Sequence, residues 1–426
     1  MAGISAARNA LIKNPVRRDT EFTQDMTYSS SPADAASPAV HNVFLAMLPI
    51  TLAVFVGFLT IGLPLPVLPL HLHYTLGMSP LVVGIAIGSQ FAAALLSRAW
   101  AGNLADTRGA KRAVITGLLI AAVSGVAYLS SLAFMATPTA SLGVLLLGRV
   151  LLGCAESLVI TGALSWGMGL VGRENAGKVM AWVGIAMYGA YAAGAPAGTL
   201  IYGSHGFFGI AVATIIIPLL ALGVVAPARP VAVSAARRAP FYKVLGAVFV
   251  PGLGLALCST GLGVITTFIA LLFAARNWGS ASLAFTAFGA AFIGARLLFA
   301  HLPDKIGGAR VALVCVLIEA MGQLLIWQAD HVLTAYVGAA FTGFGYSLAF
   351  PGFGVEAVRR APPQSRGVAM GAFVAFFDIS LGVTGPASGA IASAAGVNAV
   401  YLASAVAVML STIIALYLMV NPPRPV

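Results

Sequence analysis

Charged residues are scarce in this chain of 426 residues, because Asp, Glu, Lys and Arg together make up 8% of it. Soluble domains carry roughly 25% charged residues. Hydrophobic residues, in contrast, make up 60% of the chain. A water-soluble protein of this composition would lack polar surface to cover itself, whereas a bilayer accepts apolar side chains on the outside. The composition therefore predicts a membrane protein.

Cysteine is equally sparse, with Cys154, Cys258 and Cys315 each inside an apolar run and no C-x-x-C pair. This spacing predicts packing residues and excludes a disulfide framework or a cysteine metal site. Residues 1–42 lack the apolar core of a secretory signal and are rich in Ser, Pro and Ala. We expect them to form a disordered cytoplasmic tail.

Common sequence motifs of hydrolytic enzymes, metal sites and nucleotide-binding proteins are also missing. The sequence contains no H-E-x-x-H, no G-x-S-x-G, no cysteine–histidine cluster and no P-loop. The net charge of +11 comes from short clusters between apolar runs, without interleaved aromatics. That pattern is typical of membrane topology and not of nucleic-acid binding. We expect no enzymatic activity, no cofactor, no metal and no nucleic-acid partner, with a membrane-embedded enzyme or a receptor or scaffold as remote alternatives.

Apolar runs long enough to cross a bilayer are abundant, since a spanning helix needs about 20 such residues. The runs predict an all-α membrane protein with twelve spans, at 44–71, 80–104, 112–134, 142–170, 178–202, 207–227, 243–274, 280–303, 310–328, 332–358, 366–394 and 398–421. Pro64, Pro66 and Pro69 should bend the outer end of the first span.

The basic residues support this count. If both termini are cytoplasmic, nineteen of the 23 Lys and Arg residues fall on the cytoplasmic side and only Arg276 on the other. The remaining three, Arg98, Arg149 and Arg296, lie inside spans. Because cytoplasmic loops carry an excess of Lys and Arg, this asymmetry predicts the orientation as well as the count.

The chain also repeats itself. Arg98, Asp106 and Gly109 match Arg296, Asp304 and Gly307 at an offset of 198 residues. At an offset of 190, Gly177, Met180 and Pro196 match Gly367, Met370 and Pro386. The repeat predicts two similar six-helix halves, 43–227 and 243–421, joined by a cytoplasmic central loop at 228–242 and followed by a short tail at 422–426.

The loop between the second and third spans reads G-N-L-A-D-T-R-G-A-K-R over 102–112. It resembles the G-x-L-A-D-R-x-G-R-K signature of the major facilitator superfamily, although Thr107 and Ala110 replace the usual basic residues. The resemblance covers 43–421 and implies the major facilitator fold. Residues 59–73 and 77–90 resemble more specifically the YhhS/YfcJ-type branch of bacterial inner-membrane transporters, whose substrates are poorly defined.

Two further motifs resemble those of drug/proton antiporters. Arg149 stands in G-R-V-L-L-G, like the intramembrane arginine motif of that family. The antiporter motif G-x-x-x-G-P-x-x-G is degenerate in the fifth span, around Pro196, and better matched in the eleventh, around Pro386. The resemblance implies export, whereas uptake by symport or facilitated diffusion remains the alternative.

The resemblance also implies a gate at the 102–112 loop. Asp106 would cap the positive end of the eleventh helix and hold the outward-facing state, because a carboxylate is stabilised at a helix N-terminus. The predicted gating set is Gly102, Asp106, Arg108, Gly109, Lys111 and Arg112, with Asp304 and Gly307 in the second half. The alternative is a topology signal followed by a turn.

Ions inside spans are functional candidates, because a charge at the bilayer centre is costly. Arg149 and Glu156 share a face of the fourth span, with Gly153 between them leaving room for side chains or water, and Asp378 lies mid-way along the eleventh. We predict that Arg149, Glu156 and Asp378 carry proton coupling. The alternatives are a static structural ion pair, for example of Arg149 with one of these acids, or direct binding of a cationic substrate.

The other two buried arginines have different expected partners. Arg296 and Glu319 lie at matching depths, which predicts a structural salt bridge between them. Arg98 has no acid in the third span and is expected to reach toward Asp378 across the two halves.

Polar and aromatic side chains in the spans provide a candidate substrate site, formed by Gln90, Trp166, Tyr188, Tyr346 and Phe377, with Tyr191 and Gln323 as further possibilities. Each is, taken alone, a common packing residue. Glycine pairs four apart, Gly84/Gly88, Gly194/Gly198 and Gly385/Gly389, allow close helix packing. In the fifth and eleventh spans they should face the opposite half.

These patterns together predict a secondary active transporter working by alternating access, with proton-coupled efflux of a small organic molecule such as a drug, sugar or metabolite. The expected partners are this solute, protons and the lipid bilayer. We expect a monomer in the bacterial inner membrane, with both termini in the cytoplasm.

Overall fold

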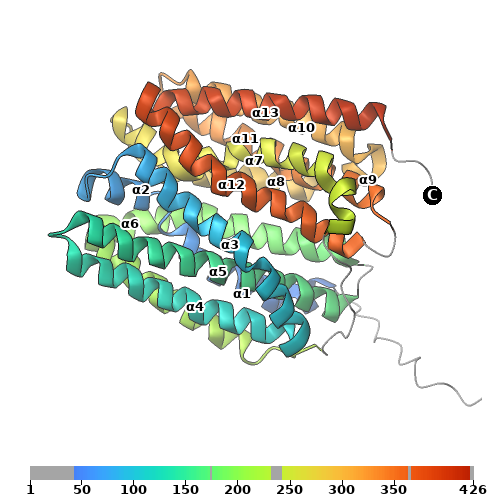
Figure 1. Cartoon of the computed structure of the whole chain (residues 1–426), viewed down its shortest axis with the longest axis horizontal. Helices are drawn as coiled ribbons and strands as arrows, with labels where there is room; N and C mark the ends of the chain where they lie inside the picture. The colour runs from blue at the N-terminus through green and yellow to red at the C-terminus, as the bar shows by residue number, and fades with distance from the viewer. Residues whose placement is uncertain (1–42, 173–174, 232–241, 363–365, 423–426) are drawn as a thin grey trace, which may run out of the picture. The chain divides into compact units, whose positions relative to one another are not determined.

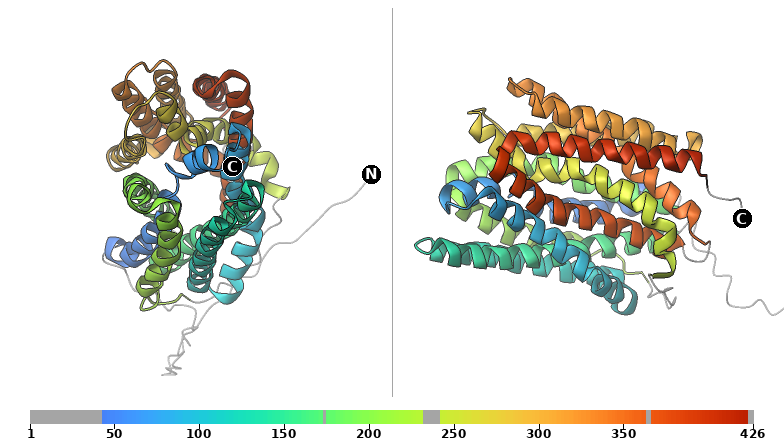
Figure 2. Two further views of the ribbon diagram at one scale, coloured as in Figure 1. Left: turned by 90° about the vertical axis from the view of Figure 1, so that its left-hand side faces the viewer. Right: turned by 45° about the horizontal axis from the view of Figure 1, so that its top comes forward.

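The structure, a computed structural model, describes residues 43–172, 175–231, 242–362 and 366–422. The predicted N-terminal tail, most of the central loop and most of the C-terminal tail lie outside these ranges. Every regular element within them is a helix. Figure 1 shows the long helices lying side by side, and the left view of Figure 2 looks along many of them. The predicted all-α membrane architecture is confirmed.

The long helices have the following bounds: α1 (Val43–Gly62), α3 (Pro80–Arg108), α4 (Ala110–Ser131), α5 (Pro138–Val171), α6 (Ala176–Val225), α7 (Tyr242–Ala275), α8 (Ser282–Phe299), α10 (Gly308–Trp327), α11 (Val332–Arg360), α12 (Arg366–Ala395) and α13 (Val397–Val420). Short turns link some of them: α2 (Leu68–Leu70), the π-helix η1 (His71–Thr75), the 3-10 turn η2 (Leu132–Phe134) and α9 (Leu302–Ile306).

Eleven of the described helices are long and apolar enough to cross a membrane, one fewer than the twelve spans predicted. The difference lies in α6, which runs for 50 residues and contains two of the predicted spans. A continuous helix of this length would measure about 75 Å, more than twice the hydrocarbon core. Its course is interrupted at Gly206, whose φ of 61° and ψ of −157° are not helical.

The first predicted span ends earlier than its hydropathy suggests. The α1 helix stops at Gly62, and a proline-rich turn leads into α2 and η1. Proline lacks the backbone donor that a continuing helix needs, so Pro64, Pro66 and Pro69 account for the bend. The predicted bend is confirmed.

The sequence repeat has a counterpart in the geometry. Gly109 and Gly307 separate consecutive helices with nearly the same backbone angles, φ 100° and ψ 143° against φ 98° and ψ 140°. Positive φ of this kind is readily available only to glycine. A Cβ on Gly153 would lie 2.0 Å from the carbonyl oxygen of Gln90, and one on Gly343 would lie 2.1 Å from that of Phe288. The α3/α5 and α8/α11 pairs therefore pack in the same way.

Among the described helices, two pairs make the most extensive contact between the halves, and we call them the α3/α12 seam and the α6/α8 seam. In the first, a Cβ on Gly84 would lie 2.1 Å from the carbonyl oxygen of Gly385, and one on Gly389 would lie 2.6 Å from that of Pro80. In the second, the hydroxyl of Thr286 donates to the carbonyl oxygen of Ala192 at 2.8 Å. Both seams bring backbones close by means of small residues.

These contacts lie toward one end of the bundle. We call the end with the α3–α4 turn, at the right of Figure 1, the basic end, and the opposite one the far end. Pro80 and Gly84 are in the first turns of α3, so the α3/α12 backbone contacts lie near the far end.

Not every small-residue pair faces the other half. Cβ atoms on Gly194 and Gly198 would meet Gly62 and Leu63 of the same half, at 3.0 and 2.0 Å respectively. The expectation that this pair faces the opposite half is therefore wrong, since α6 turns it toward α1. The outer surface carries large apolar side chains, including Leu96, Leu200, Leu297 and Val420, as a lipid-facing surface requires.

Candidate functional site

An ion pair crosses the α3/α12 seam. Arg98 on α3 donates from Nε to Asp378 on α12 at 2.7 Å, and its Nη2 lies 2.5 Å from the same carboxylate oxygen. The Asp378 side chain is 2% exposed and that of Arg98 is 19% exposed. The predicted approach of Arg98 to Asp378 is confirmed. A buried, charged contact of this kind holds the two halves together and is costly to break on one side only.

A second buried acid lies beside this pair. Glu156 on α5 accepts a hydrogen bond of 2.7 Å from the side-chain amide of Gln90 on α3. Asp378, Arg98 and Arg149 all lie close enough to Glu156 to act on its charge. The two acids come from different halves, so the structure brings the predicted pair of carboxylates into one cluster.

Gly153 has a different role from the one expected. It does not provide room for water beside Glu156, because its Cα faces the carbonyl of Gln90 in the closest α3/α5 contact. That contact brings the Gln90 side chain within reach of Glu156 one turn farther along α5. The glycine therefore positions the amide–carboxylate hydrogen bond.

Arg149 is fully buried, and no acid among the described residues forms an ion pair with it. Its Nε and Nη2 donate to the carbonyl oxygens of Ala86 and Ile87 on α3, each at 3.3 Å. The alternative of a static ion pair of Arg149 with Glu156 or Asp378 is not what the structure shows. The guanidinium instead ties α5 to the backbone of α3 and places a positive charge near Glu156.

An aromatic cluster joins the halves at the other seam. The Tyr188 ring lies 3.9 Å from the Phe292 ring and 6.2 Å from that of Tyr346, measured between centroids, and Tyr346 lies 6.5 Å from Phe377. Three of the predicted substrate residues, Tyr188, Tyr346 and Phe377, are thus brought together, whereas Gln90 belongs to the acid cluster.

Trp166 is separate from both clusters. Its indole Nε1 donates to the carbonyl oxygen of Arg229 at 2.9 Å, just after α6 ends. The side chain therefore joins the basic end of α5 to the start of the central loop. The structure does not place Trp166 with the other predicted substrate residues, because α5 is 34 residues long and Trp166 stands near its last turn.

The predicted salt bridge between Arg296 and Glu319 is wrong. The Arg296 guanidinium lies over the Phe292 ring, with Cζ 5.2 Å from the centroid. Neither carboxylate oxygen of Glu319 has a hydrogen-bond partner in the described part of the chain. Equal depth along the two helices was not sufficient to predict this pairing, because Glu319 points from α10 toward α7 and α11.

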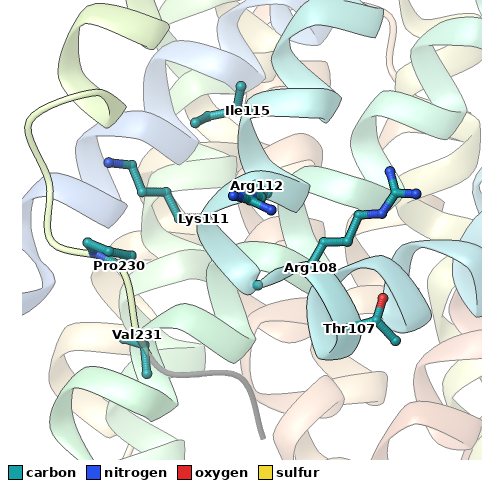
Figure 3. A pocket seen from close by; sticks show the side chains of 8 residues that line it. Thr107, Arg108, Lys111, Arg112, Ile115, Pro230 and Val231 are labelled. Carbon is teal, nitrogen blue, oxygen red and sulfur yellow. The ribbon is translucent and has the colours of Figure 1, made fainter.

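At the basic end, the 102–112 loop forms a cationic hollow. The cavity of ≈ 560 Å³ is lined by Thr107, Arg108, Gly109, Lys111, Arg112, Ile115, Pro230 and Val231. Figure 3 shows Lys111 extending toward the side where Pro230 lies, and Arg108 extending the other way. The Lys111 Nζ donates to the carbonyl oxygens of Ala226 and Ala228, both at 2.8 Å. It thereby satisfies carbonyl groups at the end of α6.

The other predicted gating residues differ in how far they are buried. Gly102 is buried in α3, Asp106 is half-buried in its last turns, and Arg112 is exposed. Asp304 is exposed in α9, beside Gly307. Sequence reasoning missed Glu356, which accepts from the backbone N–H of Ala309 at 3.3 Å and so caps α10.

Arg360, also missed, links this cap to the end of α13. It pairs with Glu356 and donates to the carbonyl oxygen of Asn421 at 2.6 Å. The i, i+4 spacing of Glu356 and Arg360 was a usable signal for their pairing. Lys111 in one half and Arg360 in the other hold the last helix of each half at the basic end.

The arrangement is that of a polytopic helical transporter: two similar helix bundles, buried charges between them, and no group of three or more His, Cys, Asp or Glu side chains able to hold a metal within the described residues. The sequence matches the Major Facilitator Superfamily over residues 50–279 and again over 252–426. The chain belongs to this superfamily, and it is a membrane transporter and not an enzyme.

Similar proteins carry names that agree with this family assignment. An uncharacterized MFS-type transporter of Burkholderia mallei is 47% identical over 395 residues, covering 91% of this chain and 96% of the relative. One from Pseudomonas aeruginosa is 43% identical over 391 residues, covering 92% and 97%. Both names specify the transporter class and leave the substrate open.

Solved structures share the fold. The human organic anion transporter MFSD10 (TETRAN) superposes with a TM-score of 0.66 at 15% identity, over 88% of this chain and 99% of that one. A mutant of the nucleoside transporter NupG gives 0.71 at 14%, over 87% and 99%. A bacterial homolog of the human lysosomal transporter Spinster, inward-facing and unoccupied, gives 0.70 at 14%, over 88% and 96%.

Proposed function

We propose that this protein is a secondary active transporter that exports a small organic molecule in exchange for protons. It would work as a monomer in the bacterial inner membrane, with both termini in the cytoplasm, so that the basic end is cytoplasmic. The halves that move would be 43–227 and 243–421, linked by 228–242. We assign it to the YhhS/YfcJ-type branch on the resemblance of residues 59–73 and 77–90.

The Arg98–Asp378 ion pair carries this proposal. It joins the two halves, its carboxylate is almost fully buried, and Glu156 lies beside it. An ionised carboxylate at this depth is stable only while the arginine faces it. When the halves rock and Arg98 moves away, the buried carboxylate of Asp378 loses its positive partner. Protonation of Asp378 then removes the unpaired charge. Conformation and protonation are thereby linked.

The transport cycle follows from that link. A proton taken up from the outside neutralises Asp378 or Glu156 and releases the arginine contact. Rocking of the halves then exposes the cluster to the cytoplasm. Solute binding near Tyr188, Tyr346 and Phe377 favours return of the Arg98–Asp378 pair, and the proton leaves to the cytoplasm. The return step carries the solute outward.

The described arrangement fits the cytoplasm-open stage of this cycle. Backbone contacts of Gly84 with Gly385 and of Pro80 with Gly389 close the seam near the far end. The outward-open stage requires these contacts to separate. We propose that the 102–112 loop then forms the cytoplasmic gate, with Asp106 at the N-terminal end of α12.

The gate has its own test. Asp106→Asn removes the charge that would stabilise the outward-open stage, so transport should slow while the amount of folded protein stays unchanged. Initial transport rates in proteoliposomes, normalised to reconstituted protein, measure this. Normal rates in Asp106→Asn would refute the gating role.

The substrate class is open to direct search. Neighbouring structures include transporters named for organic anions and for nucleosides. Purified protein in liposomes with an internal pH-sensitive dye should be tested with an organic anion, a nucleoside, an organic cation and a sugar. An outward solute gradient that moves protons inward supports antiport. Protons that travel with the solute would establish the alternative, symport or facilitated uptake.

The carboxylate assignment needs matched variants. Solute-driven proton flux should be lost in Glu156→Gln and Asp378→Asn. Asp330→Asn, which neutralises an exposed carboxylate before α11, should keep it. Unchanged flux in both buried variants would show that coupling does not use these acids.

A further inference from the structure

A second buried polar cluster lies within the C-terminal half, away from the ion pair. Glu319 on α10 is 0% exposed, and both of its carboxyl oxygens lack a hydrogen-bond partner among the described residues. Gln323, one turn farther along α10, is also fully buried, and its side-chain carbonyl oxygen is likewise unpartnered in the described chain. Three acceptor oxygens therefore lie on one face of α10.

Three helices enclose these oxygens. The Gln323 amide nitrogen donates to Oγ1 of Thr342 on α11 at 3.0 Å and to the carbonyl oxygen of Gly261 on α7 at 3.4 Å. A Cβ on Gly261 would lie 2.5 Å from Oε1 of Glu319 and 3.4 Å from that same nitrogen. Glycine at 261 thus lets the carboxyl group lie directly against the backbone of α7. The two amide contacts also fix which way the Gln323 carbonyl points.

The fold itself does not require this cluster. At the 198 offset, Glu319 and Gln323 correspond to Ala121 and Gly125, and at the 190 offset Thr342 corresponds to Leu152. All three equivalents are buried. The equivalence is structural as well, because Gly148 approaches the carbonyl of Ser124 as Gly338 approaches that of Gly322. An apolar set fills the same place in the N-terminal half.

The chemistry of the cluster favours a small monovalent cation. An unpaired carboxylate in the membrane interior is costly, and three acceptor oxygens offer one another no donor. The titratable groups near the carboxyl are the thiols of Cys258 on α7 and Cys315 on α10, and no described charged side chain acts on it. A single carboxylate with neutral oxygens matches one positive charge, whereas divalent ions usually take more oxygen ligands.

We propose that Glu319, Gln323 and the backbone at Gly261 form an exchangeable site for a proton or Na⁺, with Thr342 holding the Gln323 amide in place. The site is distinct from the Arg98–Asp378 pair and does not depend on the direction of solute transport. Because α7 and α11 both contact it, binding there biases the packing of the C-terminal half.

The test uses full-length protein in nanodiscs, without any solute. Infrared difference spectra are recorded on a pH jump and on replacing choline chloride by NaCl at fixed pH. A pH-sensitive dye reports released protons. In the wild type, a protonated carboxyl band should change with pH. If the site takes Na⁺, NaCl should also release protons, and if it takes only protons, NaCl should have no effect.

Variants locate the signal. Glu319→Gln should abolish the assigned band change and any Na⁺-driven proton release, while Asp330→Asn should retain both. Gln323→Leu keeps the carboxyl group but removes an oxygen, and should weaken Na⁺ binding roughly tenfold or more if Na⁺ binds. It also serves as the second variant if Glu319→Gln fails to fold. A signal that persists in Glu319→Gln overturns the proposal. So does a Glu319 carboxyl group that responds to neither pH nor Na⁺, because that result describes a static neutral acid.

Discussion

The two seams between the halves are built from equivalent positions but hold the halves together differently. At the 198 and 190 offsets, Arg98 corresponds to Arg296 and Asp378 to Tyr188. The α3/α12 seam pairs its arginine with a carboxylate at 2.5 Å, whereas the α6/α8 seam presents its arginine to the Phe292 ring and to nearby Tyr188 and Tyr346. The same backbone arrangement thus carries an ionic contact on one side and an aromatic one on the other.

The internal repeat therefore accounts for the backbone arrangement of the two seams but not for their different side-chain contacts. A symmetric transporter needs two seams that open and close, which glycine and small residues provide in both places. Proton coupling needs only one charged contact whose partners separate. We therefore expect the α3/α12 seam to be sensitive to changes of charge and the α6/α8 seam to be far less so.

The strongest perturbation should be Arg98→Gln. It leaves Asp378 buried without its cation, and breaking a buried pair on one side costs about 3–5 kcal/mol. The thermal unfolding temperature in detergent should fall clearly. The double variant with Asp378→Asn should recover much of the loss, because no unpaired charge remains. If the single variant were as stable as the wild type, the ion pair would not hold the seam.

Gly84→Val should come next. The added side chain meets the carbonyl oxygen of Gly385, from which even a Cβ would lie 2.1 Å away, so the far end cannot close. Overpacking of this kind costs about 1–3 kcal/mol, enough to slow transport roughly tenfold. Transport rates in proteoliposomes test this. Gly371→Val is the control on α12, because a Cβ at Gly371 meets nothing within 4 Å. Equal rates in the two variants would contradict the seam assignment.

Thr286→Val is a smaller perturbation of the α6/α8 seam. The isosteric change removes the 2.8 Å hydrogen bond to Ala192 without adding volume. A neutral hydrogen bond contributes about 1 kcal/mol, so a modest fall in unfolding temperature is expected, with transport retained. A loss as large as that of Arg98→Gln would place the main contact between the halves at this seam instead.

Arg296→Gln should change the protein least. A cation–aromatic contact at a partly exposed site contributes about 0.5–1 kcal/mol, and no carboxylate is left unpaired. Proton-coupled transport should stay within about threefold of the wild type, since about 0.6 kcal/mol corresponds to that ratio. Measured beside Arg98→Gln, this variant compares two equivalent arginines in one protein. Loss of proton coupling in Arg296→Gln would remove the distinction between the seams.

Much of this arrangement could be predicted from the sequence, because hydropathy and repeat offsets report positions along helices. The approach of Arg98 to Asp378 followed from such positions, and so did the expectation that Gly385 and Gly389 face the opposite half. The predictions that failed depended on the direction in which a side chain points around its helix axis. Arg296 and Glu319 share a depth but point to different neighbours, and Gly194 faces α1 instead of the other half.

Other features were missed because they depend on how the ends of the bundle meet. Trp166 was expected in the substrate site and instead binds the carbonyl of Arg229. The cap that Glu356 places on α10 joins two helix ends 47 residues apart in the chain. Hydropathy carries no information about such contacts. The span count differs because two of the predicted spans meet at the non-helical turn of Gly206 and lie within one element, α6.

The proposed mechanism rests on Asp378 as the group that couples proton movement to solute movement. Two activities of Asp378→Asn should therefore be compared in the same proteoliposomes, with a solute identified from the panel above. One is solute exchange at equal pH, and the other is solute accumulation driven by a pH gradient. If Asp378 couples the two movements, exchange persists while pH-driven accumulation is lost. Accumulation at the wild-type level in Asp378→Asn would show that coupling does not pass through this carboxylate.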